Sequence, residues 1–182
     1  MTDRDATMSV ARANLFAVAW LPVSAVLPLG PFVLLWGSDG LASAIPAATD
    51  LRLAIPLLVV SLLVHESLHA VGFRLFGRAP RQAVRIGFQR RTLTPFANCT
   101  TPVPASAYRA TALLPGAVLG ALPALVGCLV GSGGMVLYGW AMLAVAGGDL
   151  AAVWAIREVP SGTLVLDHPS RVGCQVTEQP AG

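Results

Sequence analysis

Four long apolar segments dominate this chain and leave few folds open to it. They cover residues 15–36, 53–76, 110–130 and 135–156. Each has close to the ~20 residues that a helix needs to cross the hydrocarbon layer of a membrane. Only 12% of the residues are charged, about half the share that is usual in a soluble domain. We therefore predict an all-α integral membrane protein with about four transmembrane helices, forming one domain over residues 1–182 with a polar tail at 157–182.

Prolines interrupt two of the segments. The first contains Pro22, Pro28 and Pro31, and the third contains Pro115 and Pro123. Transmembrane helices tolerate proline when neighbouring groups satisfy the freed carbonyls, so we expect kinked spans. The first segment is longer than the apolar core of a signal peptide, about 7–15 residues, so we interpret it as a span.

The loop between the second and third segments carries most of the positive charge. By the positive-inside rule this loop is cytoplasmic, and four spans then place both termini in the cytoplasm, with the inner cell membrane as the expected location. Nucleic acid is not an expected partner, because no base-reading motif accompanies the charge. Residues 84–96 are rich in β-branched and aromatic side chains and predict a short extended hairpin in this loop. The loop holds no acid, and its arginines are Arg78, Arg81, Arg85, Arg90, Arg91 and the flanking Arg109.

An H-E-x-x-H sequence, His65-Glu66-Ser67-Leu68-His69, lies inside the second apolar segment. Positions i and i+4 share one face of a helix, so His65 and His69 can reach one metal ion. Glu66 flanks the same site and can contact a water molecule on the metal without binding the metal itself. The alternative is a pair of core histidines that hydrogen-bond only to neighbours on their own helix. Unpaired polar groups are costly in hydrocarbon, which argues against it. The motif therefore predicts a zinc site.

Asp149 is the candidate for the third metal ligand. A catalytic zinc usually takes three protein ligands and keeps one position open. Apart from Glu66, Asp149 is the one acid deep in an apolar segment. Counted from the outer ends of their spans, the histidines and Asp149 both lie about 20–25 Å deep. Gly147 and Gly148 precede Asp149, and we expect them to let the fourth span approach the second closely.

The remaining polar groups carry weaker signals. The chain has three cysteines, Cys99, Cys128 and Cys174, with no C-x-x-C spacing, so free thiols are expected. Asp167-His168-Pro169 in the tail could cap the site or form a turn, and a structural role is favoured.

Several blocks of the sequence together resemble a known family. They are the H-E-x-x-H motif, residues 93–99, Leu114-Pro115-Gly116, Gly147-Gly148-Asp149-Leu150 and residues 165–170. The chain resembles the putative zincin peptidases, a family of small membrane proteins distantly similar to the site-2 class of intramembrane zinc metalloproteases. The resemblance implies that His65, His69 and Asp149 bind Zn2+ and that Glu66 is the catalytic acid and base. Site-2 proteases set their ligand Asp in an Asn-Pro…Asp-Gly sequence, whereas Asp149 follows two glycines.

These features predict a zinc-dependent intramembrane metalloprotease. It would hydrolyse peptide bonds of membrane or membrane-proximal substrates, with Glu66 activating a zinc-bound water. An extended substrate could add as a strand to residues 84–96. The alternative is a non-catalytic metal-binding membrane protein, such as a sensor or a scaffold that binds clients. Glu66 favours the enzyme, because a pure binding site does not need it.

Overall fold

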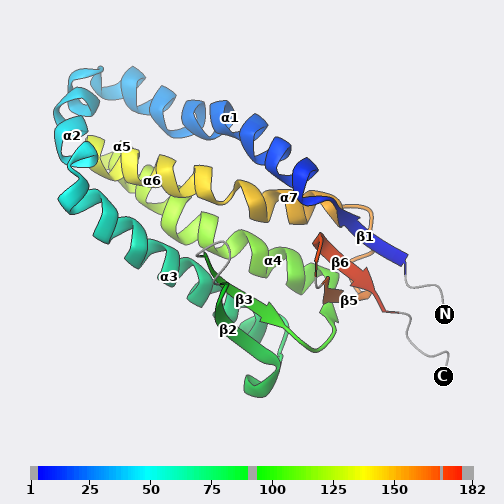
Figure 1. Cartoon of the computed structure of the whole chain (residues 1–182). Helices are drawn as coiled ribbons and strands as arrows, with labels where there is room; N and C mark the ends of the chain where they lie inside the picture. The colour runs from blue at the N-terminus through cyan, green and yellow to red at the C-terminus, as the bar shows by residue number, and fades with distance from the viewer. Residues whose placement is uncertain (1–3, 90–93, 169, 178–182) are drawn as a thin grey trace.

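The computed structural model describes residues 4–89, 94–168 and 170–177. It is mostly helical: long helices run side by side, and the strands gather toward the end where both termini lie (Figure 1). A π-helical turn, Gly116–Ala121, joins α4 to α5, and a short 3-10 turn, Arg81–Ala83, follows α3. The helices are α1 (Val10–Trp36), α2 (Asp39–Thr49), α3 (Leu51–Leu75), α4 (Ala105–Pro115), α5 (Leu122–Val130), α6 (Gly133–Val145) and α7 (Gly147–Ala155).

The predicted apolar segments coincide with the long helices. Three helical stretches are long and apolar enough to cross a membrane, namely Val10–Trp36, Leu51–Leu75 and Ala105–Val130. A fourth is formed if the pair Gly133–Val145 and Gly147–Ala155, bent by 41°, counts as one span. The predicted and observed ends differ by a few residues, which is usual for helix termini. A further helix, α2, occupies the connection between α1 and α3 and was not predicted.

The hairpin expected at residues 84–96 is present. Strand β2 (Val84–Gln89) pairs antiparallel with β3 (Thr94–Cys99), and Ile86 faces Ala97 across the pair. Residues 90–93 between the two strands, which include Arg90 and Arg91, lie outside the described residues. Both strands contact α3, so the hairpin lies along the second half of the predicted metal-binding helix.

A second, four-stranded sheet was not part of the all-α prediction, although the fold is mostly helical as expected. Its strand order is β1-β6-β5-β4, with every neighbouring pair antiparallel. The sheet pairs residues from opposite ends of the chain, and such nonlocal pairing leaves no periodic signal in a short polar tail. Its strands are β1 (Arg4–Met8), β4 (Val103–Pro104), β5 (Leu164–Asp167) and β6 (Val172–Val176).

A buried cluster ties the helix ends to both sheets. It collects side chains from the end of α3, the start of α4, the region after α7 and the strands. Burial of this cluster removes apolar surface from water and fixes the strands relative to the helices. The largest contributors are Phe73, Tyr108, Ile156, Val103 and Val165.

Gly72 sets the distance between α3 and α4. A Cβ atom at this position would lie 2.9 Å from Thr111 Cγ2 and 3.0 Å from Thr111 Cα. The second of these atoms is backbone, so a larger residue would have to push the helices apart.

We expect Gly72→Ala to lower the free energy of unfolding by about 1–3 kcal/mol, because it overpacks this contact. Thermal unfolding of the purified protein measures the change. Gly134→Ala is the matched control, since open space surrounds Gly134 in α6 and alanine has the better helix propensity. Equal unfolding temperatures for the two variants would contradict the prediction.

Candidate metal centre

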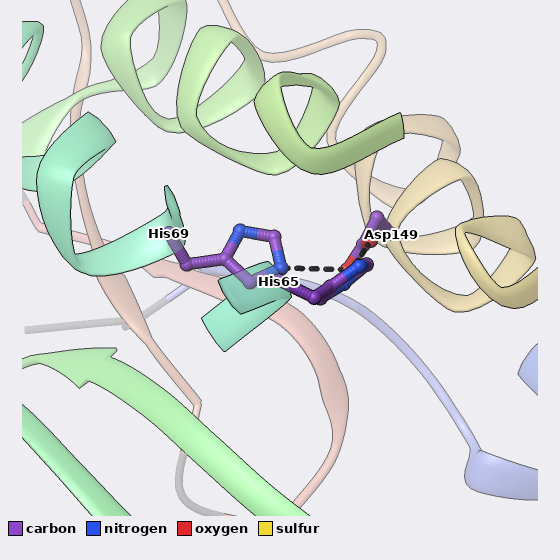
Figure 2. Close-up of side chains that lie close together, drawn as sticks. All are labelled: His65, His69 and Asp149. Carbon is purple, nitrogen blue, oxygen red and sulfur yellow. Dashed lines mark ion pairs between the residues drawn. The ribbon is translucent and has the colours of Figure 1, made fainter. Parts of the chain in front are cut away.

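Three side chains from two distant helices converge on one point. His65 and His69 lie on α3, and Asp149 lies on α7 (Figure 2). His65 Nε2 lies 3.0 Å from Asp149 Oδ2, and His69 Nε2 lies 3.2 Å from Asp149 Oδ1. The three side chains are only 7%, 12% and 22% exposed. The structure thus brings together the three side chains that the sequence predicted as metal ligands.

The donor atoms fit a zinc ion. The three ligand atoms lie within 4.8 Å of one another, and tetrahedral zinc needs donors about 3.3 Å apart. Asp149 Oδ2 is buried without a hydrogen-bond partner among the described residues, although His65 Nε2 lies beside it. Two imidazoles and one carboxylate are a donor set of catalytic zinc sites and leave a fourth position open.

A proline leaves free the backbone carbonyl that orients His69. The Nδ1 atom of His69 lies 3.1 Å from the carbonyl oxygen of Thr111 on α4. That carbonyl has no partner four residues ahead, because Pro115 lacks an N–H, and the next N–H, of Gly116, bonds to Leu113. When Nδ1 donates to Thr111, the Nε2 lone pair of His69 is left facing Asp149. Such supporting hydrogen bonds fix the tautomer and orientation of metal-binding histidines.

We expect Pro115→Ala to weaken zinc binding about 10-fold, because the new N–H competes for the Thr111 carbonyl and His69 loses its acceptor. Competition with a chromophoric chelator measures the affinity. Pro123→Ala, in the same helical stretch, removes a proline that is not four residues after Thr111 and is expected to leave the affinity unchanged. An identical affinity for both variants and the wild type would contradict the role of Pro115.

The bend between α6 and α7 sets the position of Asp149. The two helices meet at 41°, and Asp149 lies in the first turn of α7. The N–H groups at a helix N-terminus favour a carboxylate there. The expected role of the two glycines was wrong: a Cβ at Gly147 would lie 3.2 Å from Ala17 of α1, and Gly148 faces open space. The two glycines mark the break between α6 and α7. Helix α4 packs against both α3 and α7.

Strand β3 runs beside Glu66. The backbone N–H of Ala97 lies within hydrogen-bonding reach of the Glu66 carboxylate. Two residues along, the N–H of Cys99 donates to Asp167 Oδ2 at 2.9 Å. Alternate residues of a strand point their N–H groups to the same edge, so the edge of β3 opposite β2 faces Glu66. Pro95 occupies the same edge and has no N–H to offer.

Asp167, on β5 of the four-stranded sheet, anchors β3. It accepts hydrogen bonds from the Cys99 N–H and from the Tyr108 hydroxyl. Burial raises the pKa of the Asp167 carboxyl, and the two hydrogen bonds oppose that rise. The neighbouring His168 accepts backbone N–H bonds from Ser170 and Arg171 at its Nδ1 atom and so forms a turn, while Pro169 lies outside the described residues. Asp167 and His168 thus have the structural role that the sequence favoured.

The three cysteines are free thiols. Cys99 and Cys174 are buried in the cluster between the sheets and the helix ends. Burial raises the pKa of the Cys174 thiol to about 12, so this side chain packs as a small apolar group.

A family model described as putative zincin peptidase matches residues 58–164. The chain belongs to this family. The match confirms the family resemblance and supports a metallopeptidase that uses zinc. It includes the H-E-x-x-H motif and Asp149 but ends before Asp167, so the tail block 165–170 lies outside it. No curated protein and no solved structure gave a significant match.

The groups around the candidate ligands were harder to predict from the sequence. The Thr111 carbonyl and the Ala97 N–H belong to the backbone, so the residue types at these positions do not indicate their roles. The spacing of Pro115 from Thr111 is the one local signal, because a proline frees the carbonyl four residues before it.

Proposed function

We propose that this protein is a zinc-dependent intramembrane metalloprotease that hydrolyses peptide bonds of membrane or membrane-proximal substrates. The observation that most directly supports this proposal is the convergence of His65, His69 and Asp149 between apolar helices. Glu66 lies next to His65 in the motif. Family membership supports the zinc chemistry.

The outer surface of the helices supports insertion into a lipid bilayer. Large apolar side chains face outward along the long helices, for example Leu34 at 88%, Leu129 at 71% and Val26 at 70% exposed. Soluble monomers rarely expose contiguous apolar surface of this kind. The arginines that follow α3 lie at the other end of that helix from α2, toward the end of the molecule where both termini lie (Figure 1). The positive-inside rule favours the cytoplasmic side of the inner membrane for that end.

The residues of the site divide the chemistry among them. His65, His69 and Asp149 would hold the metal. Bound zinc would supply Lewis-acid chemistry, polarising the scissile carbonyl and acidifying the attacking water. Glu66 takes a proton from that water and delivers it to the leaving amine. The Ala97 N–H near the carboxylate limits the orientations that Glu66 can adopt.

The edge of β3 opposite β2 offers a place for the substrate through its main-chain carbonyls, because the N–H groups of Ala97 and Cys99 on this edge already face Glu66 and Asp167. An extended peptide can add to an exposed strand edge through main-chain hydrogen bonds, with little dependence on side chains. A helical membrane segment hides its peptide bonds, so it must unwind locally before it can bind in this way. The substrate class is therefore a membrane protein or peptide with a segment that unwinds easily near the cytoplasmic face.

Removal of the metal tests the proposal. We expect about one zinc per chain by elemental analysis of the purified protein, as for a single site with three protein ligands. In proteoliposomes with a tagged single-span substrate whose helix carries a Gly-Pro pair, 1,10-phenanthroline should abolish cleavage and added zinc should restore it. Chains without zinc would refute the metal site. Zinc-loaded chains that cleave no member of a panel of such substrates would favour the non-catalytic metal-binding protein.

A further inference from the structure

Four exposed arginines gather where α3 ends. Arg74 lies in its last turn, Arg78 and Arg81 follow it, and Arg85 lies on β2. Among the described residues, none of the four forms an ion pair. The sequence has no Asp or Glu between Glu66 and Asp149. Within the described part of the chain, no carboxylate therefore neutralises the charge of this cluster.

A shallow pocket of about 430 Å3 lies between two of these arginines. Its lining combines guanidinium groups with exposed apolar side chains, Val71 at 51% and Leu75 at 65% exposed. Val71 lies about one helical turn before Arg74 and Leu75, three and four residues away, so it shares a face of α3 with each of them. The pocket thus presents hydrocarbon toward the apolar length of the helix and positive charge at its end. The lining residues are Val71, Arg74, Leu75, Ala79, Pro80 and Arg81.

The backbone around the pocket is well anchored. The N–H of Ala79 bonds to the carbonyl of Phe73 at 3.1 Å, closing the helix with a left-handed residue, Arg78, at φ 52°. Ala79 and Phe73 are both buried in the core. The 3-10 turn that contains Arg81 is also fixed, because the Thr100 N–H donates to the Ala83 carbonyl at 2.8 Å. Binding of a ligand would therefore cost little free energy in ordering this backbone.

We propose that this pocket binds the headgroup of an anionic phospholipid. The phosphate sits between Arg74 and Arg81, and the acyl chains run along Val71 and Leu75. A guanidinium fork matches phosphate oxygens in a bidentate way, and basic pockets at the cytoplasmic ends of spans recruit anionic lipids. A free phosphate shares the charge chemistry, but it would leave the apolar half of the pocket uncovered. The inference shares only the bilayer with the proposed function and does not depend on catalysis.

Lipid titration of the full chain in a neutral maltoside detergent tests the site. Phosphatidylglycerol is expected to bind saturably, as measured by native mass spectrometry, and phosphatidylcholine with the same acyl chains is not. The double variant R74Q/R81Q should lose about 25-fold in affinity for phosphatidylglycerol, at about fivefold per arginine. R52Q/R171Q removes the same charge elsewhere, from exposed arginines at the other end of α3 and in the tail, and should bind like the wild type.

Several results would overturn the site. They are equal binding of phosphatidylcholine, equal affinity of R74Q/R81Q and the wild type, or inorganic phosphate competing as well as the lipid does. Zinc content and unfolding temperature without lipid report whether R74Q/R81Q is folded. If it is not, R81Q alone, outside the helix, carries the test with about a fivefold expected loss. Because zinc content is read separately, a failed lipid site and a failed metal site are distinguishable.

Discussion

Glu66→Gln is expected to keep its zinc and to lose proteolysis by about 10²–10⁴-fold, the usual contribution of a general acid and base. Glutamine has nearly the same shape as glutamate and keeps an oxygen that can accept from the Ala97 N–H near this side chain. It cannot take a proton from the attacking water at neutral pH. The proposed metal ligands His65, His69 and Asp149 are untouched, so zinc content should match the wild type.

The measurement pairs elemental analysis with cleavage of the tagged substrate in proteoliposomes. Ser67→Ala is the matched control, because Ser67 belongs to the same motif but is exposed and bonds only to the Leu63 carbonyl of its own helix. It should cleave at close to the wild-type rate. Full proteolysis by Glu66→Gln would remove Glu66 from the mechanism and leave the metal site without its catalytic assignment.

Asp149→Ala is expected to lower zinc affinity by more than the ~100-fold that loss of a mere supporting partner can cost. Asp149 is the one proposed ligand outside α3, and without it two imidazoles on a single helix remain. His65→Ala should behave alike, since it also leaves two donors. Zinc content after dialysis against a weak chelator, and affinity by competition, are the measurements.

Asp39→Ala controls for the general effect of removing an acid, because Asp39 is exposed at the start of α2. Its zinc content should be that of the wild type. Wild-type affinity in Asp149→Ala would mean that the carboxylate merely balances the charge of the histidines, and that the third ligand must be sought elsewhere.

The sequence predicted those features that depend on local pattern. The apolar lengths located α1, α3 and the stretch through α4 and α5, and helical spacing placed His65 and His69 on one face. The match in depth brought Asp149 to them, because the second and fourth predicted spans start from the same membrane surface and a helix rises by a fixed amount per residue. Residues 84–96 predicted the hairpin from their β-forming side chains.

Other features depend on contacts between distant segments. The pairing of β1 with β6 joins the two ends of the chain, and neither strand is long or apolar enough to be recognised alone. Gly147 and Gly148 fit two explanations, close packing and a helix break, and only the neighbours of each glycine decide between them. The direction of the β3 edge follows from Asp167, which lies far along the chain from Cys99.

The anchoring of β3 by Asp167 has a consequence for the order of events during synthesis. The histidines of α3 leave the ribosome early, whereas β5 and β6, which hold the β3 edge in place, are made later. A nascent chain therefore carries its histidines before β3 is held in place beside Glu66.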